Sequence, residues 1–79
     1  MTLNLPRDLL GVRYEGTALS QRERAVLRLI ARGYTGPETA RKLHVSPTTV
    51  KTQLRIARAR LGARTTAHAV GIAVSLDMI

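Results

Sequence analysis

The chain has 79 residues and a formal charge of +8, with thirteen Lys or Arg against five Asp or Glu. It contains no Cys, Phe or Trp, which excludes a disulfide framework and a thiolate metal site and requires an aliphatic core. A chain of this length forms one small domain, and it has no apolar run near the roughly 20 residues that a membrane-spanning helix needs.

The positive charge is concentrated in the middle of the sequence. Residues 20–64 hold eleven of the Arg and Lys residues and two Glu. Eleven of the thirteen cations in the whole chain are arginine, which suits planar, bidentate recognition of phosphate and guanine. This clustering favours a polyanion over a merely solubilising surface, so nucleic acid is the expected partner, with no membrane partner.

Residues 1–18 contain no motif. We expect a partly ordered N-terminal lead-in there, and a folded domain over residues 19–79. The first predicted helix of that domain begins at Ser20, where S-Q-R-E forms a capping box with Glu23, and it ends at Gly33. Its core-facing residues are Val26, Leu27, Leu29 and Ile30, and its solvent-facing residues are Arg22, Arg24, Arg28 and Arg32.

A second, short helix is predicted from a second capping box, T-G-P-E, in which Thr35 is the cap and Glu38 lies three residues later. It ends near His44, and Val45 is expected to be buried before a tight turn into Ser46. Ala40 and Leu43 are predicted to face inward, and Arg41 and Lys42 to face outward.

The third predicted helix is the element around which the rest of the chain is organised. Ser46 can cap it, Pro47 suits its first position, and Gly62 ends it. Together with the preceding helix it forms a helix-turn-helix, and its small, hydroxyl-bearing first turns suit the major groove of DNA. The apolar face comprises Val50, Leu54, Ala57 and Leu61, and the outward face comprises Thr48, Lys51, Thr52, Arg55 and Ala59.

A fourth helix is predicted from its cap Thr65 to about Leu76, and it is apolar on nearly every side. A domain this small cannot bury such a helix completely, so part of its surface should be shared with a second copy. The core takes Ala69, Ile72, Ala73 and Leu76, which leaves Val70, Val74 and Met78 for a homodimer interface.

The sequence offers no catalytic or metal-binding constellation. His44 and His68 are the only histidines, there is no Cys, and neither a Ser/His/Asp set nor a Gly-rich phosphate loop occurs. We therefore expect a protein that is not an enzyme and uses no cofactor or metal. The absence of cysteine suits a cytoplasmic location.

Three stretches carry a family resemblance over about residues 18–76: L-S-Q-R-E-R-A-V-L-R-L-I-A-R-G-Y-T, E-T-A-R-K-L-H-V-S-P-T-T-V-K-T-Q-L and L-G-A-R-T-T-A-H-A-V. They resemble the LuxR-type (GerE-like) DNA-binding domain. The resemblance implies an all-α fold of four helices that binds double-stranded DNA to regulate transcription, with the third helix in the major groove and the fourth at the dimer contact. It implies base contacts by Lys51, Thr52 and Arg55, and candidate phosphate contacts by Thr35, Arg41, Thr48, Thr49 and Arg58.

Lys42 joins the phosphate contacts, because the helix before the recognition helix crosses the DNA backbone in this motif. The chain departs from the family pattern at Gln53, where His is usual, and at Thr39, where Ile is usual. No receiver or ligand-binding domain precedes the motif, so we expect either a stand-alone bacterial or phage protein or a domain excised from a longer one. RNA polymerase is a further candidate partner.

Two alternatives remain open. Region 4 of a sigma factor also combines T-V-K with an R-x-A-R-x-R-L run, but it has little need for a fourth apolar helix. A protein-interaction module, for instance an anti-activator that docks through its last helix, would keep the fold without specific affinity for DNA.

Overall fold

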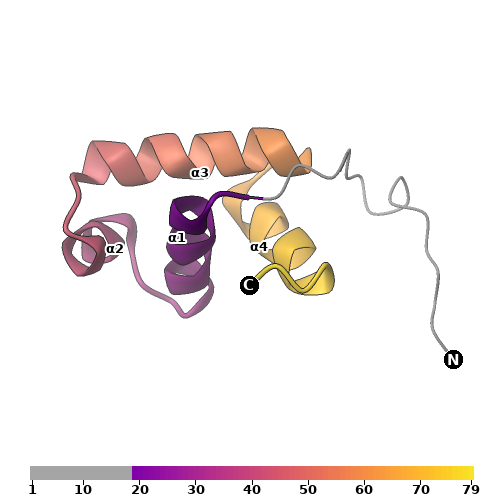
Figure 1. The fold of residues 1–79 in the computed structure, drawn as a ribbon, viewed down its shortest axis with the longest axis horizontal. Helices are drawn as coiled ribbons and strands as arrows, with labels where there is room; N and C mark the ends of the chain where they lie inside the picture. Colours follow the sequence, from indigo (N-terminus) through magenta and orange to yellow (C-terminus); the bar gives the residue numbers. More distant parts are fainter. Residues whose placement is uncertain (1–18) are drawn as a thin grey trace, which may run out of the picture.

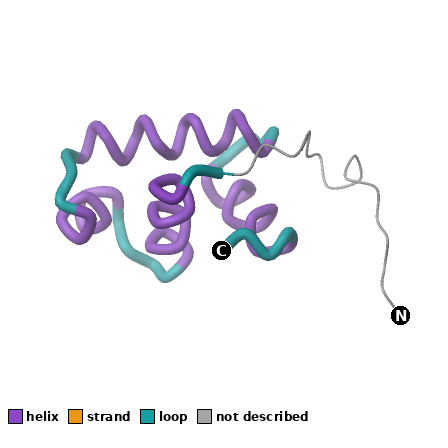
Figure 2. Tube along the Cα trace, in the orientation of Figure 1, coloured by secondary structure: helices purple, strands orange, loops and turns teal. Residues whose placement is uncertain are grey.

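The computed structural model describes residues 19–79, which form four α-helices and, over that range, no strand (Figures 1 and 2). The predicted all-α fold is thereby confirmed. The lead-in expected for residues 1–18 lies outside the described residues. The helices are α1 (Gln21–Ala31), α2 (Gly36–Leu43), α3 (Pro47–Leu61) and α4 (Thr66–Ser75).

The longest helix, α3, runs along one edge of the molecule, and the other three helices pack against the same side of it (Figure 1). No helix within residues 19–79 packs against the opposite side of α3. Among residues 19–79, no helix combines the length and apolar character that crossing a membrane would require.

All four helices begin at the cap predicted from the sequence. The side chains of Ser20, Thr35, Ser46 and Thr65 each accept a hydrogen bond from the backbone N–H three residues later. In α1 and α2 the box is completed, because the backbone N–H of the cap residue donates to the carboxylate of Glu23 (3.0 Å) or Glu38 (2.8 Å). Local hydrogen bonds therefore set where each helix starts.

The core consists of two apolar clusters that share α3. One joins α1, α2 and α3 through Val26, Ala40 and Val50, and half-buried Val45 packs against it instead of being fully buried as expected. The other joins α1, α3 and α4. Its buried members are Leu19, Leu27, Ala57, Leu61, Ala69, Ile72, Ala73 and Met78.

The predicted apolar face of α3 is confirmed. Val50, Ala57 and Leu61 are buried, and half-buried Leu54 packs against both clusters. This face fixes the rotation of α3 about its axis and so determines which side chains point away from the protein.

Met78 was wrongly expected to remain outside the core, since its side chain is only 8% exposed. After α4 the chain reverses at Asp77, which adopts a left-handed φ of 59°. The N–H of Met78 then donates to the carbonyl oxygen of Ala73 at 2.8 Å, which turns the methionine back onto the α1–α3–α4 cluster.

Candidate nucleic-acid interface

The outward side of α3 carries a depression of about 420 Å³. It brings together all three predicted base-contacting residues, of which Lys51 and Arg55 are exposed and Thr52 is half-buried. Lys51 and Arg55 are four residues apart and therefore stand one turn apart on the same side of the helix. The full lining is Thr48, Lys51, Thr52, Leu54, Arg55, Arg58 and Thr66.

Thr66, in the first turn of α4, also lines the depression and was not predicted from the sequence. No local pattern marks it, because its position depends on how the Gly62 turn places α4 beside α3. Gly62 adopts a left-handed φ of 65°, and the N–H of Ala63 donates to the carbonyl oxygen of Arg58 at 2.8 Å. This turn brings the start of α4 next to the basic side of α3.

The charged side chains of α3 are all positive. The helix has no acidic residue in its first turn, and it carries Arg58 and Arg60 in its last. At its start, the hydroxyl of Ser46 accepts from the N–H of Thr49 (3.0 Å) and lies 2.9 Å from the hydroxyl of Thr49. The helix N-terminus adds partial positive charge, so this end of the depression suits an anion.

The phosphate-contact candidates on α2 lie outside the depression. The hydroxyl of Thr35 already accepts from the N–H of Glu38 at 3.2 Å. Arg41 is exposed, and the ammonium of Lys42 lies 5.0 Å from the centroid of the Tyr34 ring, a distance typical of a cation–π contact. Of the two cations, Arg41 forms neither an ion pair nor a cation–π contact within residues 19–79.

Glu38 is the carboxylate nearest in sequence to these cations. The backbone N–H of Thr35, and then its hydroxyl, hold the pKa of Glu38 below its ordinary value of 4.5. The charges of Arg41 and Lys42 lower that pKa further, whereas desolvation opposes the shift. The charged carboxylate is thus committed to the cap of α2.

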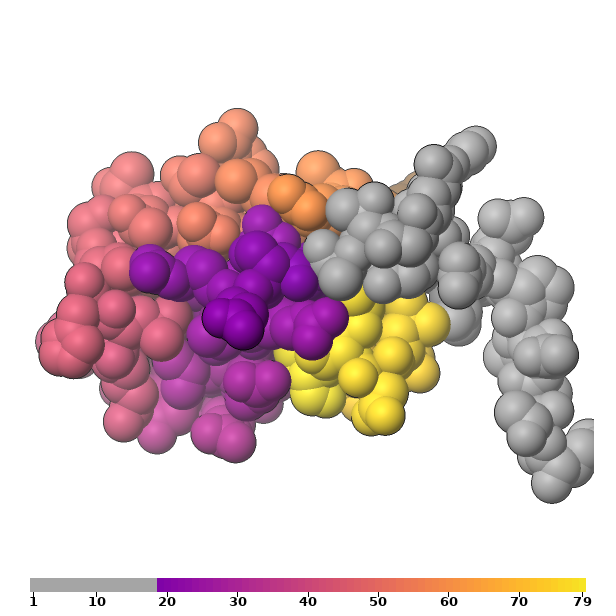
Figure 3. Space-filling view, in the orientation of Figure 1, coloured from indigo at the N-terminus to yellow at the C-terminus, as the bar shows by residue number. Residues whose placement is uncertain are grey.

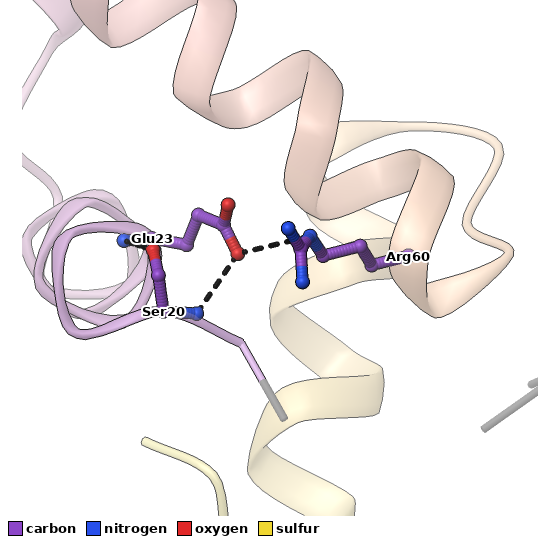
Figure 4. Close-up of polar contacts among 3 residues, drawn as sticks. All are labelled: Ser20, Glu23 and Arg60. Carbon is purple, nitrogen blue, oxygen red and sulfur yellow. Dashed lines mark hydrogen bonds and ion pairs between the residues drawn. The ribbon is translucent and has the colours of Figure 1, made fainter. Parts of the chain in front are cut away.

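Arg60 has a different role from Arg58. Its Nε lies 3.5 Å from Oε1 of Glu23, the same oxygen that accepts from the N–H of Ser20 (Figure 4). The Glu23 side chain is 4% exposed and that of Arg60 is 40% exposed. The pair links the beginning of α1 to the last turn of α3, which the sequence alone did not predict because the two residues are far apart in the chain.

The exposed side of α4 is small and apolar. Val74 is 57% exposed and is the large hydrophobic side chain that stands out on the surface of residues 19–79, whereas Val70 is half-buried against the core. Ala67 and Gly71 are also exposed, and a Cβ added at Gly71 would meet nothing within 4 Å. Met78, assigned to this surface from the sequence, lies in the core instead.

The two histidines lie at helix ends. His44 is the C-cap of α2, with a left-handed φ of 57°, and the Nδ1 of His68 accepts from the N–H of Arg64 at 3.1 Å beside the cap of α4. Within residues 19–79, no group of three or more His, Cys, Asp or Glu is placed to hold a metal ion.

Known proteins with the same features point to one family. The family described as bacterial regulatory proteins, luxR family (GerE), matches residues 17–73. The solution structure of the DNA-binding domain of the Erwinia amylovora RcsB protein is similar to this chain, with a TM-score of 0.75 and 30% sequence identity. That likeness covers 100% of this chain and 95% of the other. No curated protein matches the chain in sequence.

Proposed function

The chain belongs to the luxR family of bacterial regulatory proteins, and from this membership we propose how it meets DNA: α3 reads a specific sequence in the major groove, and two copies pair through α4. A family of DNA-binding transcription regulators is not a family of enzymes, and the similar RcsB structure is itself a DNA-binding domain. The domain therefore acts by binding, and its specificity depends on side chains that reach base edges.

The observation that carries this proposal is the basic, outward side of α3. Lys51 and Arg55 can extend toward O6 and N7 of guanine, their best acceptors in the groove. Thr52 lies between them and is short, and its methyl group suits the methyl group of thymine. These three residues line one depression that no other part of the described chain covers.

The phosphate contacts are proposed to flank this depression. Thr48 and Arg58 line it directly, whereas Arg41 lies on α2, the helix that crosses the DNA backbone in this motif. The remaining candidates are engaged within the protein and would contact phosphate with their free hydrogen-bonding capacity or charge. They are Thr35, Lys42 and Thr49.

The dimer is proposed to form through the exposed side of α4. Val74 and Val70 supply apolar surface, and the small residues Ala67 and Gly71 allow two helices to approach closely. One short helix pair buries less than the standard interface of about 1,600 Å², so pairing is expected chiefly on DNA. We place the protein in the cytoplasm with the DNA, and RNA polymerase remains a further candidate partner.

The match to the luxR family favours a sequence-specific regulator of this type over region 4 of a sigma factor. An interaction module with the same fold would lack specific affinity for DNA. Selecting bound duplexes from a random pool separates these possibilities, because a regulator enriches one sequence and an interaction module enriches none.

The residue assignments are tested by comparing Arg55→Ala with Arg41→Ala on the selected duplex and its single-base variants. Arg55→Ala should cost about 1–3 kcal/mol on the best site and flatten the preference at one or two base pairs. Arg41→Ala should weaken all sequences about equally. With roughly 8 phosphate contacts per dimer, the log–log salt slope of the unmodified protein is about −7. Arg41→Ala removes one of these contacts from each copy, so it should reduce the magnitude of the slope by about 1 per copy, or about 2 per dimer. If Arg55→Ala loses the same factor on every variant, Arg55 contacts phosphate only.

A further inference from the structure

A second basic surface lies on α1, away from the depression. Arg24, Arg28 and Arg32 follow one another at intervals of four residues and therefore form one stripe along the helix, about 12 Å long, which we call the arginine stripe. Arg28 and Arg32 are exposed and Arg24 is half-buried. Figure 3 views the molecule from the side on which α1 lies between α2 and α4, with α3 along the upper edge.

No carboxylate within residues 19–79 forms an ion pair with an arginine of this stripe. Glu23 pairs with Arg60, which is the one ion pair within residues 19–79, and Glu38 is bound to its own cap. The Nε of Arg24 is shielded from solvent and has no hydrogen-bond partner there. Like charges four residues apart repel each other on a helix, although Arg28 and Arg32, at the C-terminal end of α1, also interact favourably with the helix dipole.

The stripe also points away from the proposed DNA surface. On α1, Val26 and Glu23 face α3, through the cluster containing Val50 and through the pair with Arg60. Arg28 and Arg32 lie on the opposite side of α1 from those contacts. A duplex held on the outward side of α3 would leave the stripe exposed.

We propose that the arginine stripe is a docking surface for an acidic helical segment of another protein. Carboxylates spaced four residues apart on such a helix match the spacing of the arginines, and guanidinium groups bind carboxylates through paired, charge-assisted hydrogen bonds. The small side chain of Ala25 lies one turn from Arg28 on the same side of α1 and lets a helix approach there without obstruction. Only the direction of the stripe relative to DNA depends on the proposed function.

The test uses the full chain bound to a selected duplex, so that α3 is occupied. The probe is a labelled alanine-based helical peptide with glutamate at every fourth position, and its twin carries glutamine instead. Fluorescence anisotropy should show that the glutamate peptide binds the complex and that the glutamine twin does not. The double variant Arg28→Ala/Arg32→Ala should bind the glutamate peptide about tenfold more weakly, since two exposed ion pairs are lost.

The matched comparison is between single variants. Arg28→Ala and Arg22→Ala each remove one exposed arginine from α1, but Arg22 lies off the stripe. Arg28→Ala should weaken peptide binding and leave DNA affinity unchanged, whereas Arg22→Ala should leave peptide binding nearly unchanged. Circular dichroism checks that both fold, which is expected because alanine favours helix.

Three results would overturn the proposal. Equal losses in Arg22→Ala and Arg28→Ala would mean that the peptide senses only net charge. Equal binding of the two peptides would make the stripe a solvated surface. A lower DNA affinity and a salt slope smaller in magnitude by about 1 for each bound copy in Arg28→Ala would make the stripe a phosphate contact instead. Because DNA binding is measured separately, a failure here does not bear on the role of α3.

Discussion

At the scale of single residues, Thr39 combines complete burial with an unused hydroxyl. Its side chain is completely buried on the side of α2 that packs against the domain, and Oγ1 has no hydrogen-bond partner among the described residues. An unsatisfied buried polar group costs about 1–3 kcal/mol. We therefore expect Thr39→Val, which replaces the hydroxyl by a methyl group, to raise the free energy of unfolding by about 1 kcal/mol in urea titrations.

Thr49→Val is the control for that change. The Thr49 hydroxyl lies 2.9 Å from the Ser46 hydroxyl at the cap of α3, so its removal should lower the free energy of unfolding. If both substitutions destabilise the protein, the hydroxyl of Thr39 has a partner in solution, and its burial carries no penalty.

Glu38 gives the pH dependence expected at the residue scale. Hydrogen bonds from the backbone and the hydroxyl of Thr35 hold its folded-state pKa below the ordinary value of 4.5. A lowered folded-state pKa means that the ionised carboxylate stabilises the fold above the unfolded-state pKa and that this stability is lost as pH falls through the folded-state pKa. Glu38→Gln should therefore lower the Tm at neutral pH, and its difference from the unmodified protein should shrink in acid. If the difference in Tm between the two proteins does not change with pH, the cap does not depend on the ionised form of Glu38.

The element scale shows what the sequence could and could not predict. Each helix start depends on a hydrogen bond that spans three residues, so Ser20, Thr35, Ser46 and Thr65 could be recognised from spacing alone. The apolar face of α3 was likewise predictable, because helical periodicity fixes it. From that face followed the grouping of Lys51, Thr52 and Arg55.

Contacts between distant parts of the chain were not predictable in this way. The pairing of Glu23 with Arg60 and the arrival of Thr66 beside α3 depend on how helices cross. The burial of Met78 was not predictable for a similar reason. The chain reverses at Asp77, beyond the end of α4, so helical periodicity does not apply to Met78.

On α4, a substitution at Gly71 should affect the stability of a single copy and the pairing of two copies in opposite directions. Glycine inside a helix is destabilising by roughly 0.5–1 kcal/mol relative to alanine, and the added Cβ would meet nothing within 4 Å in the same chain. Gly71→Ala should thus raise the Tm of the free protein. If two copies of α4 approach closely at this residue, the same methyl group should weaken pairing on DNA in sedimentation measurements. Higher stability with unchanged pairing would place Gly71 outside the interface.

At the scale of the whole molecule, the basic side of α3 and the apolar side of α4 act together only if two domains bind adjacent half-sites. A single domain makes few phosphate contacts, and pairing two domains adds their contacts and steepens the dependence on salt. Affinity for a paired site should therefore exceed that for a single half-site, by an amount that depends on the contact between the two α4 helices.

Val74→Glu tests that coupling directly. Val74 is 57% exposed, so the substitution should leave the fold of each domain intact. Burying the exposed parts of two valines contributes on the order of 1–2 kcal/mol, and two facing carboxylates would replace this gain by repulsion. We expect binding to paired half-sites to weaken by about tenfold or more, while binding to a single half-site changes little.

Ser75→Glu places the same charge about 100° around the same helix and should have a smaller effect on pairing. Gel-shift titrations on one and two half-sites measure both variants, and circular dichroism reports folding. If Val74→Glu unfolds the domain, Val74 supports the core and the dimer surface must lie elsewhere.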